Sequence, residues 1–469
     1  MSQPVSDNVY FIGIGGVGMS GIARVAHDQG LHVEGSDLKA SRFTQPLEEA
    51  GITVHIGHAA GNLPEGDPTI VVSTAILDEN PELVEAKRRG LNIVRRAEML
   101  AHLGRDLDTV AVAGTHGKTT TSSMLASTLD GMGLSPTFLI GGMVREYGAN
   151  SHSGEGRYYV VEADESDKSF THLSPKAVIV TNIEPDHLDH YEDIQEIHSQ
   201  FGQFISLVPE GGPVVVWAGD EKLVEVAREN ASNVITYGTE EGADARVTAV
   251  TREGIASHFT LRLPDGRTVT STIRQNPGIH NVLNGAATLV MVDALGEDVD
   301  AAARALAEFA GVRRRFDLVG RTSEVDVVDD YAHHPTEIAA TIKAAREMDY
   351  RRVHVVFQPH RYSRAKLFTE VLHDEFGAAF DLADTVTFMD VYPAGETPIP
   401  GVSGKTFLNV VLDHAGCPEA EFVPRRLDVP AHVADLAGAG DVVLTLGAGD
   451  VTEIGQLVLD ELARRAERA

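Results

Sequence analysis

Short apolar segments alternate with amphipathic ones along the whole chain, a pattern typical of α/β units around a mainly parallel sheet. In the first part, GMSGIARVAHDQ has helical periodicity, and Gly30 follows it where a left-handed residue would end a helix. The apolar segments around it read VYFIGI, GITVHIG, TIVVST and LNIVRR. We therefore expect a first domain over residues 1–106.

The second part opens with an apolar segment, Thr109–Gly114, after the polar joint GRDLD. Residues 245–273 alternate apolar and polar side chains around an Asp265–Gly266 turn, which predicts antiparallel strands. Residues 280–309 are helix-rich and close a central domain that we place at residues 107–312. Its other apolar segments read YYVVEADE, KAVIVTN and VVVWAG.

The third part, residues 313–469, alternates again and ends in a polar helix, LVLDELARRAERA. Its apolar segments read EVDVVDD, RVHVVFQ, TVTFMDV and VVLTLG. A chain of 469 residues is long enough for about three domains. The expected fold is α/β with a Rossmann-like N-terminal domain, a central P-loop ATPase-like domain whose mainly parallel sheet carries added antiparallel strands, and a Rossmann-like C-terminal domain.

Composition limits the partners. Hydrophobic residues are 43% and charged residues 23%, which is ordinary for a globular protein. The net charge of −30 disfavours nucleic acid and anionic membranes as partners. The sequence has no apolar run long enough for a membrane span and no signal-peptide pattern, and its single cysteine, Cys417, fits a reducing compartment. We expect a cytoplasmic protein without membrane insertion.

A glycine-rich turn follows the first apolar segment, where Gly13, Gly15 and Gly18 fit G-x-G-x-x-G at the start of a helix. Backbone amides at such a turn approach a diphosphate, and the helix N-terminus favours its negative charge. Glu34 and Asp37 lie beyond the second expected strand, at a spacing suited to binding a ribose. The motif is typical of NAD sites, but alone it predicts a diphosphate nucleotide of unspecified base, or a turn with a structural role only.

A second glycine loop, residues 114–121 (GTHGKTTT), lies between the segment TVAVAG and a helical segment. In a phosphate-binding loop, backbone N–H groups hold the β-phosphate, the Lys neutralises β/γ charge and the Thr hydroxyl ligates Mg²⁺. The strict pattern has Gly where this chain has Val112, so the loop is a variant or, alternatively, structural only. Two phosphate sites in separate domains favour an enzyme that uses ATP on a nucleotide-linked substrate over a plain dehydrogenase.

Acidic and histidine side chains follow the next two apolar segments. The first group is Glu162, Asp164, Glu165 and Asp167, and the second is Asp186, His187, Asp189 and His190. Because the carboxyl ends of parallel strands meet at one sheet edge, we expect both groups near the phosphate loop. Hard oxygen ligands suit Mg²⁺, whereas His187 alone is more typical of a hydrogen-bonding histidine, and acid clusters are also common in solvated loops.

Three further segments combine polar and cationic residues. Residues 276–284 (NPGIHNVLN) open a helix with amides and a histidine suited to adenine or phosphate. Residues 311–316 (GVRRRF) lie at an expected domain joint, where a cation reaches ATP phosphates on closure unless the segment is only a solvated basic linker. Residues 357–364 (FQPHRYSR) follow a strand-like segment and carry a positive cluster suited to a carboxylate or phosphate.

Taken in order, these motifs resemble those of the Mur ligases of peptidoglycan synthesis, especially the alanine-adding members, over nearly the whole chain. They read GIGGVGMSGIA, GSD, GTHGKTTTSSM, EADESDKSF, TNIEPDHLDHY, HNVLNGAAT, RRRFD, DDYAHHPTE and FQPHRYSR. The resemblance implies that the first domain binds a UDP-linked substrate rather than NAD, that the central domain binds ATP, and that the C-terminal domain brings the amino acid and closes the cleft.

The resemblance also implies roles for single residues. On the UDP-substrate side these are Gly13, Gly15, Gly16, Val17, Gly18, Ser36, Asp37 and Ser73. On the ATP side they are Gly114, Thr115, His116, Gly117, Lys118, Thr119, Thr120, His280, Asn281, Asn284, Arg315 and Asp330. Mg²⁺, or Mn²⁺ in its place, would be held by Thr119, Glu162 and His187. The amino acid and carboxylates would be faced by His334, His360, Arg361 and Arg364. The catalytic residues would be Lys118, His187 and Arg315.

The activity implied is ATP-dependent joining of L-alanine to the lactyl carboxylate of UDP-N-acetylmuramate, by a monomer or weak homodimer. Ligases that add later residues use a carboxylated lysine after the equivalent of His187, but residues 177–221 contain no Lys, so that bridge is not expected here. The alternatives are a related ligase that recycles murein peptides, an NAD(P)-dependent oxidoreductase supported by the first glycine motif alone, and a non-enzymatic nucleotide-gated binding module.

Overall fold

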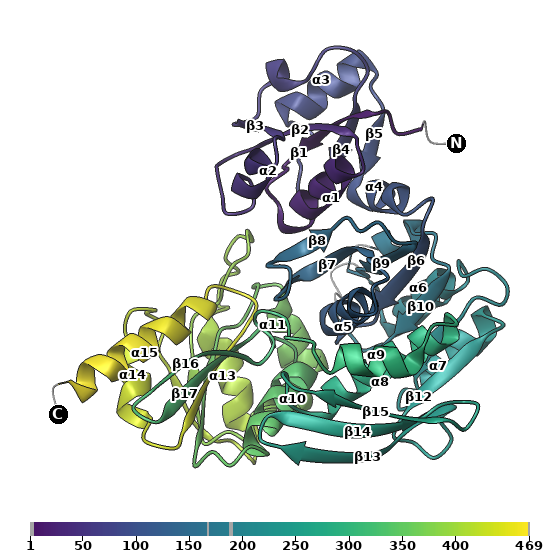
Figure 1. Ribbon diagram of the computed structural model, residues 1–469. Coiled ribbons are helices and arrows are strands. Elements are labelled where there is room, and N and C mark those ends of the chain that lie inside the picture. The colour runs from purple at the N-terminus through teal and green to yellow at the C-terminus, as the bar shows by residue number, and fades with distance from the viewer. Residues whose placement is uncertain (1–3, 167, 187–190, 468–469) are drawn as a thin grey trace.

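The computed structural model describes residues 4–166, 168–186 and 191–467. These residues form three sheets in succession along the chain, each with helices packed on it (Figure 1). No helix within the described residues is both long enough and apolar enough to cross a membrane. The three sheets with their packed helices confirm the α/β character expected from the alternating pattern.

The first sheet is wholly parallel, with strand order β3-β2-β1-β4-β5, as in a doubly wound Rossmann-like domain. Its elements are β1 (Asn8–Ile12), α1 (Val17–Asp28), β2 (His32–Asp37), α2 (Gln45–Glu49), β3 (Thr53–Ile56), η1 (Ala60–Asn62), β4 (Thr69–Val72), α3 (Pro81–Arg89), β5 (Ile93–Arg95) and α4 (Arg96–Leu103). Gly30 is left-handed two residues after α1, as the sequence predicted. Glu34 and Asp37 lie within β2 and not beyond it, because pairing with β1 and β3 extends this strand to Asp37.

The central sheet has the order β15-β14-β13-β12-β11-β10-β6-β9-β7-β8. Its elements are β6 (Asp108–Ala113), α5 (Lys118–Gly131), β7 (Thr137–Val144), β8 (Ala149–His152), β9 (Tyr158–Glu162), η2 (Ser169–His172), β10 (Ala177–Val180), α6 (Ile194–Ile205), β11 (Val214–Trp217), α7 (Glu221–Asn230), β12 (Val234–Gly238), β13 (Ala245–Glu253), β14 (Ala256–Arg262), β15 (Thr268–Ile273), α8 (Ile279–Ala294) and α9 (Val299–Leu306). The predicted antiparallel strands are β13–β15, at one edge. The hairpin β7–β8, which the sequence pattern did not indicate, forms the other edge and packs on α1 (Figure 1).

The C-terminal sheet has the order β16-β17-β21-β18-β19-β20. Its elements are β16 (Asp317–Thr322), β17 (Val325–Asp330), α10 (Pro335–Arg346), β18 (Val353–Phe357), α11 (Arg364–Lys366), η3 (Leu367–Val371), α12 (His373–Ala378), β19 (Thr385–Phe388), α13 (Gly404–Asp413), β20 (Glu419–Phe422), α14 (Val429–Leu436), β21 (Val442–Leu446) and α15 (Thr452–Ala466). All its pairs are parallel except β16–β17. The last strand, β21, inserts between β17 and β18, so the order differs from that of the first sheet.

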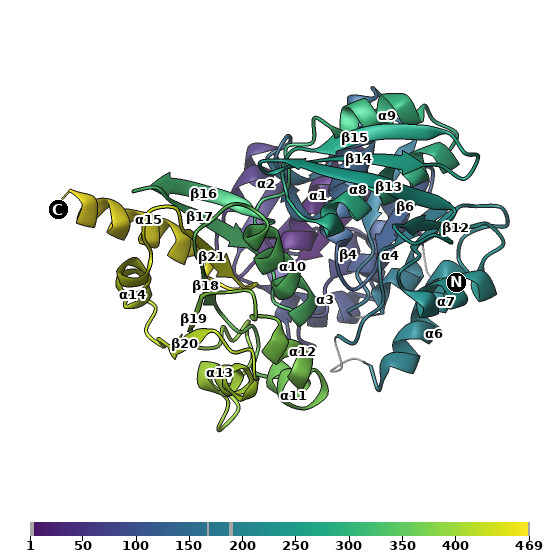
Figure 2. The same cartoon turned by 90° about the horizontal axis from the view of Figure 1, so that it is seen from below.

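The three domains are joined in two different ways. One cluster of buried apolar side chains runs from the first domain into the central one and includes Phe11, Tyr159 and Phe201. Among the described residues, the apolar clusters of the C-terminal domain contain side chains of that domain alone. Its boundary with the central domain, along which α10 lies (Figure 2), is instead bridged by ion pairs such as Arg252–Glu347 and Arg364–Asp186.

Candidate functional site

The loop that follows β6 has the shape of a phosphate cradle. Gly114 has φ +130°, and a side chain there would overlap the hydroxyl of Thr181. Gly117 is left-handed and immediately precedes α5, which begins at Lys118. Both positions therefore require glycine, and the backbone amides of the first turn of α5 face outward at a positive helix end.

Lys118 lies at the centre of this cradle. Its ammonium group donates to the carbonyl oxygens of Gly114 at 2.6 Å and Thr115 at 3.1 Å, and to Glu165 Oε1 at 2.8 Å. Burial lowers the pKa of Lys118, but the nearby carboxylates of Glu165 and Asp164 outweigh burial, so the pKa is raised overall. The group stays positively charged and is held beside the loop, as charge neutralisation of phosphate requires.

Two predicted metal ligands lie next to each other at the same sheet edge. The Thr119 hydroxyl donates to Glu162 Oε1 at 3.0 Å, and Glu162 Oε2 accepts the N–H of Gly141 at 2.7 Å. A hydroxyl and a carboxylate beside a phosphate loop are hard oxygen donors that fit Mg²⁺. The third predicted ligand, His187, lies outside the described residues, as do Asp167, Asp189 and His190.

The predicted adenine side lies at the start of α8. Asn284 approaches Gly117, whose Cβ, if present, would lie 3.0 Å from Asn284 Oδ1. Asn284 Nδ2 donates to Asn281 Oδ1 at 3.2 Å, and Asn281 Nδ2 lies 2.9 Å from His280 Nε2. Burial lowers the pKa of His280 to about 4, so this imidazole is neutral near neutral pH. Asn284 therefore borders the phosphate loop, and hydrogen-bond contacts connect it to Asn281 and His280.

Arg315 and Asp330 meet at the joint between the central and C-terminal domains. Asp330 accepts the N–H groups of Phe316 at 2.7 Å and Ala332 at 2.8 Å, and burial raises its pKa to about 6. The Arg315 guanidinium stacks over the Tyr331 ring at 5.2 Å and lies 3.7 Å from Glu337. Both groups are thus placed where the C-terminal domain faces the phosphate loop.

A cavity of about 490 Å³ lies between the central and C-terminal domains. Its lining combines Asp186 of the central domain with His333, His360, Arg361 and Arg364 of the C-terminal domain. Arg364 donates to Asp186 at 3.1 Å, and both side chains are about nine-tenths buried. Three of the residues predicted for the carboxylate side therefore share one cavity with cationic walls.

His334, the fourth residue predicted for that side, lies elsewhere. Its ring contacts His116 of the phosphate loop, with 4.5 Å between centroids. His116 in turn points away from the loop and toward the C-terminal domain, with Nδ1 3.4 Å from Glu337 Oε1. Only the backbone of His116 remains available to the loop, and its carbonyl accepts the hydroxyl of Thr181.

The first glycine turn is held by β2. The N–H groups of Gly13 and Ile14 donate to the carbonyl of Ser36 at 2.8 and 2.9 Å, and Gly15 donates to Asp37 Oδ2 at 2.9 Å. The Ser36 side chain is fully buried and donates to Glu82, so it supports the turn and does not face a ligand. The turn faces outward beyond these contacts: Gly16 precedes α1, Val17 is 47% exposed, and Ser73 follows β4.

Two residues at the site carried no recognised signal in the sequence analysis. Glu337 on α10 accepts the N–H of His333 at 3.1 Å and faces both His116 and Arg315. The second residue is Arg96, at the start of α4, whose guanidinium lies 3.5 Å from Asp164 of the central domain. The same side chain packs against Gly18, where an added Cβ would lie 3.1 Å from Arg96. Arg96 therefore links the first glycine turn to the central domain. Glu337 lies in the first turn of α10, three residues after His334, but this spacing alone does not indicate that it faces His116 and Arg315.

Comparison with known families matches each domain in order. Residues 8–107 match the Mur ligase family catalytic domain, residues 112–292 the Mur ligase middle domain, and residues 314–449 the Mur ligase glutamate ligase domain. The chain belongs to the Mur ligase family. The first glycine turn and the phosphate loop are therefore parts of a Mur ligase, and an oxidoreductase is not favoured.

Alignments with curated relatives extend over almost the whole length of this Mur ligase. A UDP-N-acetylmuramate–L-alanine ligase of Thermobifida fusca is 46% identical over 97% of this chain and 96% of its own. One of Streptomyces griseus is 44% identical over 97% of each chain. The solved structure of UDP-N-acetylmuramate–alanine ligase from Thermotoga maritima superimposes with a TM-score of 0.80 at 29% identity, covering 98% of this chain and all of the other. A murein peptide ligase of Psychrobacter arcticus gives 0.69 at 26% identity, over 97% and 98%.

Proposed function

We propose that this Mur ligase joins L-alanine to the lactyl carboxylate of UDP-N-acetylmuramate and converts ATP to ADP and phosphate. The observation that carries the proposal is the cationic cavity around Arg361 and Arg364, which opens between the C-terminal domain and Asp186 of the central domain, the domain that also carries the phosphate loop of Lys118. The similarity to alanine-adding relatives, at up to 46% identity, supports the choice of substrates.

Each domain takes one part of the reaction. Residues 1–106 bind the UDP moiety at the turn of Gly13–Gly18, because the N-terminus of α1, where Gly16 precedes Val17 and Gly18, favours a diphosphate. Residues 107–312 bind ATP, with the phosphates in the loop of Lys118 and the adenine near His280 and Asn281. Residues 313–469 supply the amino-acid side through His360, Arg361 and Arg364.

The reaction proceeds in two steps. A lactyl carboxylate oxygen attacks the γ-phosphorus of ATP, which forms an acyl phosphate and releases ADP. The amine of L-alanine then attacks the acyl carbon, the tetrahedral intermediate loses phosphate, and the amine proton is lost. Lys118 and Arg315 act by placing positive charge beside the transferring phosphoryl group, because such transfers depend mainly on alignment and charge stabilisation.

Thr119, Glu162 and His187 would hold Mg²⁺, or Mn²⁺ in its place, which supplies further positive charge to the phosphate oxygens. The hydrogen bond between Thr119 and Glu162 already brings two of these oxygen donors together. The C-terminal domain covers the phosphate loop from the other side, and its closure excludes water from the acyl phosphate.

An ADP-release assay with UDP-N-acetylmuramate and a panel of amino acids tests the proposal. We expect ADP release that requires the UDP sugar and is fastest with L-alanine over glycine and serine. Preference for an L-alanyl peptide would instead indicate the recycling reaction, and ATP binding without phosphate release would indicate a binding module. Binding of NADH in place of the UDP sugar would contradict the role of the first domain.

A further inference from the structure

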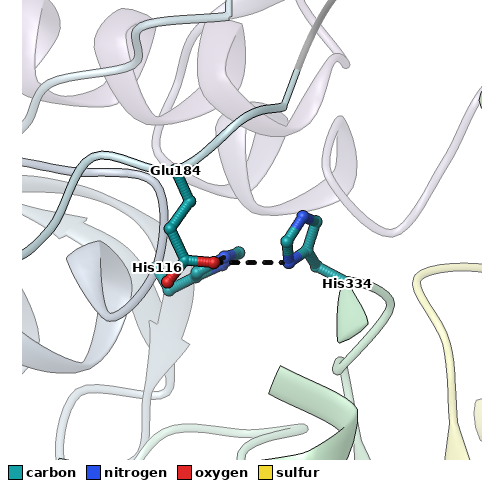
Figure 3. A group of neighbouring side chains, drawn as sticks. All are labelled: His116, Glu184 and His334. Carbon is teal, nitrogen blue, oxygen red and sulfur yellow. Dashed lines mark ion pairs between the residues drawn. The ribbon is translucent and has the colours of Figure 1, made fainter. Parts of the chain in front are cut away.

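Three side chains from two domains converge at the boundary next to the phosphate loop. His116 belongs to that loop, Glu184 follows β10 of the central domain, and His334 directly precedes α10 of the C-terminal domain. One nitrogen of each ring and one oxygen of Glu184 all lie within 4.8 Å of one another. Figure 3 shows the three side chains pointing toward a common point.

The neighbours of His334 leave one ring nitrogen facing this point. Its Nε2 lies 3.3 Å from the carbonyl oxygen of Pro185, which can only accept a hydrogen bond. Nε2 therefore carries the proton, and Nδ1 presents a lone pair. The His334 side chain is 2% exposed, and within the described part of the chain Nδ1 makes no hydrogen bond; it lies 3.9 Å from Glu184. Burial, followed by the charge of His116, lowers the pKa of His334 to about 4.

His116 differs from His334 in its charge. Burial lowers the pKa of His116, but the carboxylates of Glu184 and Glu337 outweigh burial and raise the pKa to about 9, so a bound metal ion has to displace the Nε2 proton. His116 Nδ1 faces Glu337 Oε1 at 3.4 Å, and its Nε2 faces Glu184 Oε2 at 3.5 Å without a hydrogen bond among the described residues. Metal-bound histidines in proteins usually donate their second N–H to a carboxylate or a backbone carbonyl. Glu337 and the carbonyl of Pro185 supply one partner of each kind, so the outer contacts of a metal site are present for both rings.

We propose that His116, Glu184 and His334 form a site for Zn²⁺ or a similar transition-metal ion, bridging the central and C-terminal domains. Two imidazoles and a carboxylate are a common zinc ligand set, with water in the fourth position. Ligand atoms spaced up to 4.8 Å apart need a small contraction to reach Zn²⁺ at about 2.0–2.2 Å. Nitrogen donors also distinguish this site from the oxygen pair of Thr119 and Glu162, which suits Mg²⁺.

The site bridges a boundary across which the described residues share no apolar core. Since His334 is on one side and His116 and Glu184 are on the other, an ion bound by all three binds the closed arrangement alone. Its binding energy therefore opposes separation of the domains, and we expect it to slow product release and to inhibit turnover. The ion would act as a clamp and not as part of the reaction.

Metal binding to the purified protein tests the site directly. Co²⁺, whose visible absorption reports its coordination, is used in place of Zn²⁺ and titrated into the wild type, Glu162→Gln, His334→Gln and Glu184→Gln. Binding of Zn²⁺ to the same proteins is measured by calorimetry. We expect the wild type and Glu162→Gln to show the absorption of tetrahedral Co²⁺. Because each removes a direct ligand, His334→Gln and Glu184→Gln should bind more than about 100-fold more weakly.

His373→Gln serves as the matched control, because this histidine is exposed on α12 and lies outside the cluster. Circular dichroism checks that each variant is folded. Because the Glu184 side chain is 30% exposed, Glu184→Gln is expected to disturb the folded structure less than a change at buried His334. Equal Co²⁺ affinity and spectra in the wild type, His334→Gln and Glu184→Gln would overturn the site. An unchanged radius of gyration on adding Zn²⁺ to the nucleotide-free protein would overturn the clamp.

Discussion

The ammonium group of Lys118 lies 2.8 Å from the carboxylate of Glu165, which follows β9 at the edge of the central sheet. Together with the carbonyl oxygens of Gly114 and Thr115, this carboxylate holds the lysine over the phosphate loop. The charge needed for phosphoryl transfer is therefore in place within the folded protein, and a bound triphosphate has to compete with Glu165 for it.

Replacing Lys118 removes this charge. We expect Lys118→Ala to keep the fold, because Glu165 can take up a proton, but to lose alanine-dependent ADP release by a hundredfold or more, about 3–4 kcal/mol in the barrier. Steady-state ADP release and circular dichroism measure the two effects. Lys176→Ala, which removes an exposed lysine paired with Asp108, is the control. Near-normal turnover of Lys118→Ala would refute the assignment.

The first glycine turn depends on a close approach between Gly15 and β2. A Cβ at Gly15 would lie 2.9 Å from Asp37 Oδ2 and 2.7 Å from a methyl group of Thr44. We expect Gly15→Ala to displace the turn and to raise KM for the UDP sugar at least about tenfold, while KM for ATP changes little. Gly61→Ala is matched to it, because nothing lies within 4 Å of a Cβ there. Equal KM values for the two variants would exclude the turn from substrate binding.

Arg364 contributes a charged donor to the cavity between the domains. We expect Arg364→Gln to lower kcat/KM for L-alanine by about 1.5–3 kcal/mol, roughly tenfold to hundredfold, because a hydrogen bond to a charged group is lost. The variant also loses the contact with Asp186. Initial rates at varied alanine measure the change, and Arg464→Gln, at an exposed position on α15, should behave as wild type. An unchanged kcat/KM would place the amino acid elsewhere.

His360 makes stability depend on pH. Burial, followed by the charges of Arg364 and Arg361, lowers its pKa to about 4, against about 6.5 in an unfolded chain. The unfolded chain therefore takes up the proton first, and the contribution of neutral His360, complete above pH 6.5, is lost as the pH falls toward 4.

His360→Asn removes this linkage, so the free energy of unfolding of the wild type should fall relative to the variant between pH 7 and pH 4.5. The expected relative change is on the order of 1–3 kcal/mol. Urea unfolding at several pH values measures it. A difference between the two proteins that stays constant with pH would contradict the prediction.

The separate apolar core of the C-terminal domain predicts that this domain moves as a unit while the other two stay together. Binding of UDP-N-acetylmuramate with a non-hydrolysable ATP analogue should favour the closed arrangement, because Arg315 and the cavity of Arg364, which we propose to contact the reacting groups, lie at the boundary of this domain. Small-angle scattering should then show a smaller radius of gyration than for the protein alone. An unchanged radius with both ligands bound would count against closure.

The sequence by itself determined the strands that end at the two glycine loops and the glycines within those loops. Alternating apolar periodicity and positive-φ positions are local properties. The turns at Gly30, Gly114 and Gly117 could therefore be predicted without knowing which distant segments pack against them. The expected class of fold followed from the same patterns, because parallel strands bring their carboxyl ends, and hence Lys118 and Glu162, to one edge.

Only the tertiary structure decided which side chains face one another. In the folded protein, Ser36 is buried and donates to Glu82, and the His116 ring faces Glu337 and not the phosphate loop. His334 lies outside the cavity that His360 lines. Insertion of β21 between β17 and β18 was likewise invisible in the chain order. These outcomes depend on packing between segments that are distant in the chain, such as Ser36 and Glu82, 46 positions apart, or Pro185 and His334, 149 positions apart. No local periodicity encodes such contacts.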